Sequence, residues 1–151
     1  MEIVDIMKKS DVFSRLSDED LKEVAKLCRR EEFDAGTFIF KQDTASTDLY
    51  IVEEGLVSTM LELGPTDRRQ IQGIAEYGSF SWTSVIPPYH HVTTAKAIEN
   101  TKVLAFDGKQ LRDLINTNPR LCAEVISGIA FVISQKLRMS FTQLMGVTFQ
   151  E

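Results

Sequence analysis

The fold of this chain is constrained most by residues 33–57, which read FDAGTFIFKQDTASTDLYIVEEGLV. Two apolar runs in this stretch, residues 37–40 and 49–52, are rich in residues that favour strands, and a polar segment separates them. Gly36 and Gly55 stand where a chain that reverses direction most needs a positive φ angle or a residue without Cβ. The pattern predicts consecutive short antiparallel strands.

Turn signals continue this pattern through the middle of the chain. Glu-Gly at residues 54–55, Gly-Pro-Thr-Asp at 64–67 and Glu-Asn-Thr at 99–101 separate short runs of strand-forming residues. We therefore expect strands from Glu32 to about Asp107. The predicted fold class is mainly β with flanking helices: an antiparallel β-roll, like a double-stranded β-helix or jelly roll, with N-terminal helices and a long C-terminal helix.

Two short helices are predicted before the roll. Ile3, Ile6 and Met7 indicate the first, and Ser17 is placed to cap the second. The apolar residues at helical spacing in the second are Leu21, Val24, Leu27 and Cys28.

Two more helices are predicted after the roll. Asp107 is the expected N-cap of the first, which ends near Asn118 because Pro119 disfavours helical geometry in the residue before it. The last helix runs from about Pro119 to Leu144. Its apolar residues occupy more than one stripe, so we expect one face to cover the roll and another to pair with a second subunit. A helix that only folds back on its own core is the alternative.

Length and charge limit the function. A chain of 151 residues suits one domain, here 1–151, with N-terminal helices at 1–31, the roll at 32–107 and C-terminal helices at 108–151. The net charge is −5 and the pI about 5.1. These values argue against a large phosphate-binding surface, so we expect no nucleic-acid binding by this chain alone.

Cysteine usage and the N-terminus indicate the compartment. Cys28 and Cys122 are far apart and lie in apolar helical patterns, which predicts buried free thiols and a reducing cytoplasm. The first residues form no signal peptide, and no apolar run approaches the roughly 18 residues of a membrane span. We expect a soluble, cytoplasmic protein that does not contact a membrane.

Three short motifs carry a resemblance to a known family. Gly-x-x-Ile-Phe lies at 36–40, Leu-Tyr-Ile-Val at 49–52 and Glu-Gly-x-Val at 54–57. With this spacing, the chain resembles the cyclic nucleotide-binding domain family, which includes catabolite-activator-type regulators and kinase regulatory subunits. The resemblance covers nearly the whole chain and implies a regulatory domain in signal transduction. The motifs are largely scaffold and identify a fold rather than a ligand.

In this family, the ligand is held by a short cassette, which the resemblance places at about residues 77–95. In typical members, a Gly-Glu pair opens a small helix whose amides hold the cyclic phosphate, the carboxylate binds the ribose, and a later arginine neutralises the phosphate. Alignment on Gly78 and Ala97 puts Trp82 and Thr83 at Gly-Glu and His91 at the arginine. Both charged anchors are therefore missing.

No shift of the alignment restores the anchors. Asp and Glu do not occur from Tyr77 to Ile98, and Arg does not occur from Gln70 to Leu111. Losing two charge-assisted hydrogen bonds weakens binding by about 10² to 10⁴-fold if nothing compensates. Protonated His91 would recover part of the phosphate contact, but an ordinary pKa near 6.5 leaves it mostly neutral at pH 7. The missing anchors disfavour cyclic AMP (cAMP) and cyclic GMP (cGMP), which stay open as candidate ligands, and the sequence indicates no other cofactor.

The segment still contains candidates for binding a different small molecule. These are Ser81, Trp82, Thr83, Ser84, His91, Val92 and Thr93. The competing interpretation is that Trp82 fills the volume vacated by nucleotide, whereas a polar cavity beside Thr83 and His91 would favour a ligand site. Haem or zinc is disfavoured because His90 and His91, adjacent on an extended chain, point to opposite faces.

Other charged features have ordinary explanations. The arginine pair at 68–69 is expected to be a solvated surface feature, with an anion or partner contact as the alternative.

No catalytic motif is present, which predicts that the protein is not an enzyme. Only Met145–Glu151 follow the last helix in this sequence, so we expect the signal to pass through a homodimer or a separate effector protein, unless the chain is part of a longer protein. The sequence predicts a small-ligand sensor, or alternatively a dimerising or docking scaffold that has lost ligand binding.

Overall fold

The computed structural model describes residues 1–146 and contains helices at both ends of a strand-rich region. The helices are α1 (Ile3–Lys9), α2 (Asp18–Ala25), η1 (Trp82–Ser84, a 3-10 helix), α3 (Gly108–Asn116) and α4 (Pro119–Leu144). The strands are β1 (Cys28–Phe33), β2 (Phe38–Phe40), β3 (Asp48–Glu54), β4 (Val57–Glu62), β5 (Arg68–Ile74), β6 (Ser79–Phe80), β7 (Thr94–Ala97) and β8 (Thr101–Asp107). The predicted mainly β fold with flanking helices is confirmed.

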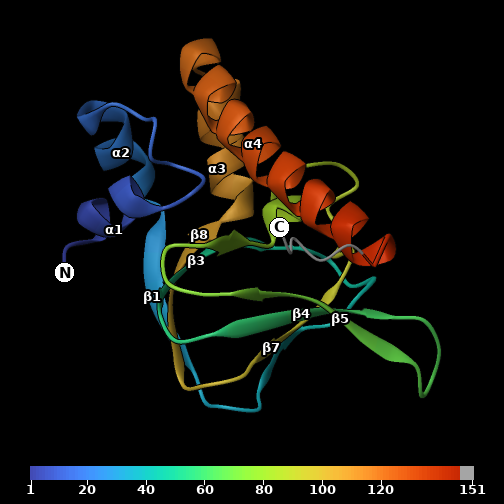
Figure 1. Cartoon of the computed structure of the whole chain (residues 1–151). Coiled ribbons are helices and arrows are strands. Elements are labelled where there is room, and N and C mark those ends of the chain that lie inside the picture. The colour runs from blue at the N-terminus through green and yellow to red at the C-terminus, as the bar shows by residue number, and fades with distance from the viewer. Residues whose placement is uncertain (147–151) are drawn as a thin grey trace, which may run out of the picture.

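The strands form two antiparallel four-stranded sheets, ordered β1-β8-β3-β6 and β2-β7-β4-β5. Figure 1 shows the sheets below the helices. The two apolar runs that flank the polar segment of residues 41–47 become β2 and β3, which lie in different sheets: β2 pairs with β7, and β3 pairs with β6 and β8. The strands are consecutive in sequence but do not pair with each other, because the chain alternates between the two layers of the roll. Tyr50, Val52 and Phe80 are among the buried residues of the core that lies within it.

The glycine at the β3–β4 turn meets a steric requirement. Gly55 has φ +113°, and a Cβ there would lie 2.6 Å from Thr101 Oγ1. Thr101 is fully buried and its hydroxyl donates to the Leu56 carbonyl oxygen at 3.2 Å. Only glycine allows the turn to pack this closely against the start of β8.

The predicted capping residues are confirmed. The Ser17 side chain accepts a hydrogen bond from the Asp20 backbone at the start of α2, and Asp107 accepts one from Gln110 at the start of α3. Asn118 does the same for Leu121 at the start of α4, whose first residue is Pro119. Each cap satisfies a backbone donor that has no partner within its own helix.

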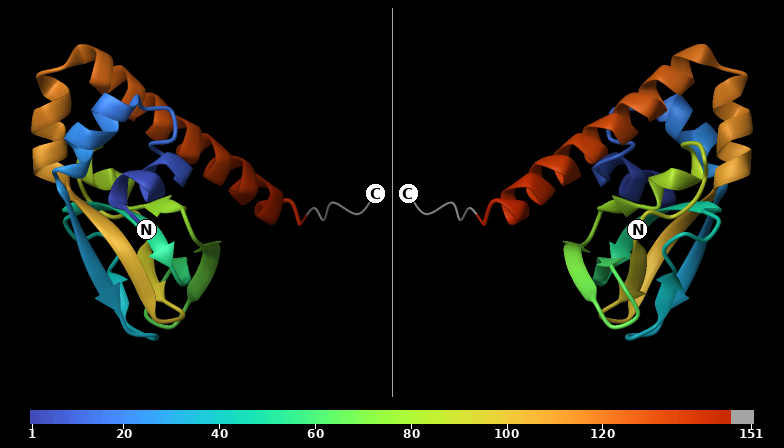
Figure 2. Two further views of the ribbon diagram at one scale, coloured as in Figure 1. Left: turned by 90° about the vertical axis from the view of Figure 1, so that its left-hand side faces the viewer. Right: turned by 90° about the vertical axis from the view of Figure 1, so that its right-hand side faces the viewer.

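The four α-helices pack together at one end of the roll, and α4 runs obliquely across it (Figures 1 and 2). A second core lies among them and includes Phe13, Leu111 and Val125. On the side of α4 that faces the α1–α2 connection, a Cβ at Gly128 would collide with the Val12 carbonyl oxygen.

The assignment of Cys28 to a helix is wrong. α2 ends at Ala25, and Cys28 begins β1, where it pairs with Phe106 of β8. The roll therefore starts at residue 28 rather than 32. Cys28 and Cys122 are both free and half-buried, and burial raises the pKa of the Cys28 thiol to about 11.

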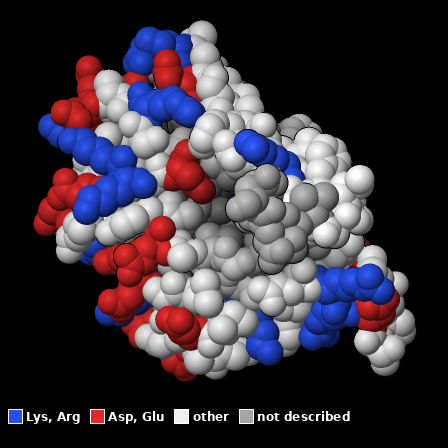
Figure 3. Space-filling view, in the orientation of Figure 1, with Lys and Arg blue, Asp and Glu red and all other residues white. Residues whose placement is uncertain are grey.

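The surface is unevenly charged. Figure 3 shows charged side chains gathered over the N-terminal helices and the β4–β5 hairpin, whereas much of α4 in this view is uncharged. Among residues 1–146, no helix combines the length and apolar character that a membrane span requires.

Candidate functional site

The cassette folds around a network of buried hydroxyl groups. Ser81 adopts a left-handed conformation (φ 64°) immediately before η1. Thr83 Oγ1 donates to Ser46 Oγ at 2.9 Å, and the hydroxyls of Ser46 and Ser81 lie 3.1 Å apart. Ser46 precedes β3, so this network ties the cassette to the first sheet.

A second set of contacts ties the cassette to α3. Arg112 Nη1 donates to the Ser84 carbonyl oxygen at 2.5 Å, and its guanidinium lies 4.2 Å from the centre of the Tyr89 ring. Gly108 lies so close to Ser84 that a Cβ there would be 2.9 Å from the Ser84 carbonyl oxygen. Arg112 is the residue directly after the arginine-free part of the sequence, and it contacts the cassette from a neighbouring helix.

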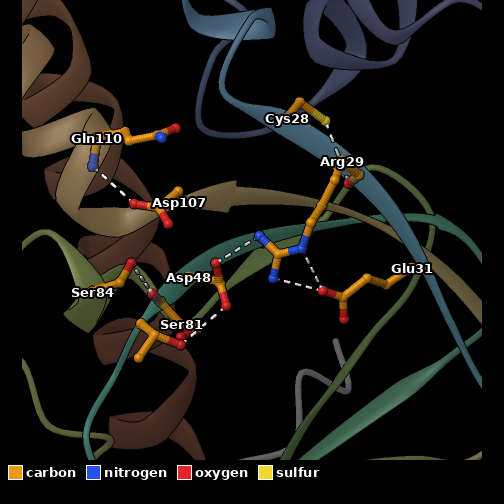
Figure 4. A network of polar contacts seen from close by, with 9 residues as sticks. Cys28, Arg29, Glu31, Asp48, Ser81, Ser84, Asp107 and Gln110 are labelled. Carbon is orange, nitrogen blue, oxygen red and sulfur yellow. Dashed lines mark hydrogen bonds and ion pairs between the residues drawn. The ribbon is translucent and has the colours of Figure 1, made fainter.

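The carboxylate of Asp48 is engaged by the protein itself (Figure 4). Asp48 is 8% exposed, and its Oδ1 lies 3.0 Å from Arg29 Nη1. Arg29 also pairs with Glu31 at 2.6 Å, and Thr47 donates to Asp48 Oδ2 at 3.0 Å. Both carboxylate oxygens have partners, so Asp48 has a structural role here.

A pocket of about 240 Å³ lies between the cassette, the second sheet and α4. The predicted site residues that line it are Ser81, Trp82, Thr83, His91, Val92 and Thr93. Ser84 does not line it: this residue is fully buried and donates to the Ser81 carbonyl oxygen at 2.9 Å. Trp82 forms part of the wall, and a cavity remains beside Thr83 and His91.

Much of the pocket comes from residues that sequence reasoning did not select. From the roll they are Phe40, Thr59, Ile71, Gln72, Ile74 and Phe80, and from α4 they are Ile133, Lys136, Leu137 and Ser140. The apolar stripe of α4 predicted that this helix covers the roll. No local signal marks which of its residues reach the cassette.

The environment of His91 keeps its imidazole neutral. The side chain is 5% exposed, and its ring stacks on Phe40 with centroids 3.5 Å apart. Burial lowers the pKa of His91 to about 4, although the charge of Asp48 acts in the opposite direction. His90 is exposed, so the two adjacent histidines have different surroundings. Residues 1–146 contain no group of three or more potential metal ligands.

Three polar contacts join the end of α4 to the edge strand β5. Lys136 Nζ donates to Gln72 Oε1 at 2.9 Å, and Gln143 Nε2 donates to the Ile71 carbonyl oxygen at 2.8 Å. Gln72 Nε2 also contacts Met139 Sδ at 3.6 Å. α4 therefore closes one side of the pocket and is held there through β5.

The arginine pair noted in the sequence at 68–69 and the acidic pair at 53–54 both lie outside this pocket. Arg68 and Arg69 are exposed and pair with Glu62 at 3.0 Å and Asp67 at 3.4 Å, respectively. Glu53 and Glu54 pair with Arg30 at 3.2 Å and Lys102 at 3.7 Å.

Comparison with known proteins identifies the family. Residues 30–118 match the cyclic nucleotide-binding domain. Nitrogen fixation regulation protein FixK of Bradyrhizobium diazoefficiens is 31% identical over 119 residues, which are 79% of this chain and 49% of FixK. The chain thus spans about half the length, or less, of the curated relatives it matches.

Solved structures share the fold. A cyclic nucleotide-binding domain from Methylobacillus flagellatus KT has a TM-score of 0.82 at 15% identity, covering 99% of this chain and 84% of that one. Catabolite activator protein of Thermus thermophilus has a TM-score of 0.74 at 23% identity, covering 89% of this chain and 62% of that one. Since the family match takes in more than half of the 151 residues, this chain belongs to the cyclic nucleotide-binding domain family.

Proposed function

We propose that this domain is a small-molecule sensor whose ligand is not a cyclic nucleotide. One observation carries the proposal: a cavity of about 240 Å³ lies at the position of the family's cassette and is bounded by the cassette, the second sheet and α4. This volume is slightly below the roughly 300–1,000 Å³ typical of small-molecule sites, which suits a compact ligand.

The groups around the cavity match a cyclic nucleotide poorly. In the described chain, the lining includes no carboxylate to accept ribose hydroxyls and no guanidinium to hold the phosphate, and its one cation, Lys136, belongs to α4 rather than to the cassette. His91 does not replace the arginine, because a pKa of about 4 leaves it neutral at pH 7. Apolar walls would leave several polar groups of ribose and base without partners.

The proposed mechanism is a population shift. A ligand that enters near residues 81–93 contacts both the cassette and α4, so it favours the arrangement in which the two are joined. The hydroxyl network around Ser46 and the Arg112 contacts hold the cassette in place from β3 and α3. A change in α4 then reaches a partner surface, with a separate effector protein as the recipient and no chemistry performed by this domain.

We also propose that the domain acts as a homodimer through α4. Its exposed apolar side chains include Phe131 at 40%, Met139 at 51%, Phe141 at 57% and Leu144 at 83%. Exposed apolar side chains in this number on one helix are unfavourable in water, and pairing with the same helix of a second copy would cover part of them.

The experiment is thermal unfolding with cAMP, cGMP, other nucleotides and compact non-nucleotide compounds at about 1 mM. A ligand with a dissociation constant near 10 μM adds roughly 2.7 kcal/mol and raises the unfolding midpoint by several degrees. Ser140→Phe, which fills the cavity from α4, should abolish the shift. Ser127→Phe, on an exposed part of the same helix, should keep it.

The outcomes separate the alternatives. A shift with a non-nucleotide compound that Ser140→Phe removes supports the proposal. A shift with cAMP or cGMP keeps the sensor role and overturns the ligand assignment. No shift with any compound, together with an intact dimer, favours the docking scaffold.

A further inference from the structure

The walls of the pocket are mostly apolar and partly aromatic. Phe40, Phe80 and Trp82 contribute rings from the roll and cassette, and Ile133 and Leu137 close the pocket from α4. Phe40 is also stacked against His91, which adds a second flat, uncharged surface. Such walls favour a ligand with a compact apolar body, because polar groups placed against them lose their hydrogen bonds to water.

One charged group interrupts this lining. Among the described residues that form the pocket, Lys136 is the sole charged side chain, since His91 is neutral. Its ammonium donates to Gln72 Oε1 at 2.9 Å, and Gln72 is 7% exposed. Lys136 has no carboxylate within 4.0 Å in residues 1–146. The hydrogen-bond acceptor of Lys136 is therefore a neutral amide rather than a carboxylate.

The surroundings of Lys136 leave its charge incompletely balanced. Burial lowers the pKa of Lys136, and the negative charge of Asp11 offsets part of this effect. Asp11 forms no ion pair with Lys136: its Oδ2 accepts a hydrogen bond from the Ser79 backbone at 3.3 Å, and its buried Oδ1 has no hydrogen-bond partner among residues 1–146. A partly desolvated ammonium without a close counter-ion gains most from an anion that arrives with the ligand.

We propose that the pocket selects a compact, largely apolar molecule that carries one acidic group, and that Lys136 of α4 binds this group. An aromatic or branched aliphatic carboxylate has this chemistry. The inference rests on the proposed sensor function and adds the ligand class. It also gives α4 a direct part in recognition, because Lys136 binds the acidic group of the ligand while the apolar body of the ligand contacts the cassette.

The test compares acids with neutral analogues of the same shape. Trp82 is the only tryptophan in the chain and lines the pocket, so its fluorescence reports binding at this site. The probes are phenylacetate with phenylacetamide, and 4-methylpentanoate with 4-methylpentanamide. We expect at least one acid to bind about tenfold or more tightly than its amide, because only the acid forms a hydrogen bond to Lys136 in which both groups are charged.

Variants then assign the preference to Lys136. Lys136→Met keeps much of the apolar stem and should remove the preference for the acid, whereas Lys136→Arg should retain it. Lys109→Met is the matched control, because Lys109 is an exposed helix lysine that pairs with Asp113 away from the pocket. The comparison of acid and amide on the unmodified protein stands even if Lys136→Met does not fold.

Each outcome decides a different point. Equal binding of acid and amide, or an acid preference that survives Lys136→Met, overturns the role of Lys136 and leaves the sensor function intact. Binding of cAMP or cGMP in place of every acid also overturns the ligand class alone. If none of the acids, amides and nucleotides changes Trp82 fluorescence or the unfolding midpoint at about 10 mM, both proposals are wrong.

Discussion

Lys136 Nζ lies 2.9 Å from Gln72 Oε1 and so connects the second half of α4 to the edge strand of the second sheet. The pair lies at the wall of the pocket, with Gln72 almost fully buried. A group that binds Lys136 in the pocket therefore acts on the contact that holds α4 against the roll. Ligand recognition and the position of α4 share one side chain.

The first prediction concerns this contact. Gln72→Met removes the acceptor of Lys136 while keeping a long side chain, so we expect a loss of about 1 kcal/mol in unfolding free energy. Amide hydrogen exchange should become faster in residues 134–144, where α4 is held by β5. Gln70→Met, an exposed position on the same strand, is the control. Equal exchange in the two variants would contradict a holding role for Gln72.

The second prediction concerns pH. Because the pKa of His91 is about 4 in the folded protein and 6.5 ordinarily, the unfolded chain binds more protons between these values. The unfolding free energy should therefore fall as pH decreases from 6.5 to 4, with a contribution from His91 of roughly 1–3 kcal/mol.

Comparison of variants isolates this contribution. The partners of Asp20 and Glu62 hold the pKa values of these carboxyls below their ordinary values of 3.8 and 4.5, so their contributions are lost mainly near and below pH 4, at the acid end of the range in which His91 acts. His91→Phe keeps a ring that can stack on Phe40 and should show a shallower decline than the unmodified protein in urea titrations at each pH. His90→Gln, at the exposed neighbour, should leave the decline unchanged. A decline that His91→Phe does not alter would show that another group is responsible.

The third prediction concerns the close approach of α4 to the α1–α2 connection. Alanine usually favours a helix over glycine by about 1 kcal/mol. At Gly128, the new Cβ would collide with the Val12 carbonyl oxygen, which is backbone and cannot move as a side chain can. We expect Gly128→Ala to lower the unfolding free energy by about 2–4 kcal/mol. Ser127→Ala, next to it on the exposed face, should change it by less than about 0.5 kcal/mol in the same denaturant titration.

The sequence predicts the features that depend on neighbouring residues. Ser17 and Asp107 cap their helices as expected, because a cap acts within about one helical turn. Cys28 continues the apolar spacing of α2, but its strand is formed by pairing with Phe106, 78 positions along the chain. Local periodicity contains no information about a partner so far along the chain, which is why the apolar spacing predicts a helix at Cys28.

The same limit applies to the pocket. Ser81, Trp82 and Thr83 were identified because the family resemblance locates the cassette, and all three line the pocket. Ser84 is a neighbour of these residues, but the turn of η1 directs it into the contact with Gly108. Lys136 follows Thr83 by 53 positions in the sequence, and its role depends on the direction of α4 across the roll. Only the packed structure brings these residues together.

The last prediction concerns the homodimer. Phe141 is 57% exposed near the end of α4, and Leu144, three positions later on the same side of the helix, is also exposed. If this surface pairs with a second copy, Phe141→Glu places two carboxylates in an apolar interface, and the dimer should weaken by about tenfold or more. Light scattering with size-exclusion chromatography over a range of concentrations measures the change. Leu63→Glu, at a 54% exposed apolar residue in the β4–β5 connection, should leave the dimer intact. A protein that is monomeric before substitution would contradict the homodimer. A dimer that only Leu63→Glu weakens would place the subunit contact at the β4–β5 connection rather than at α4.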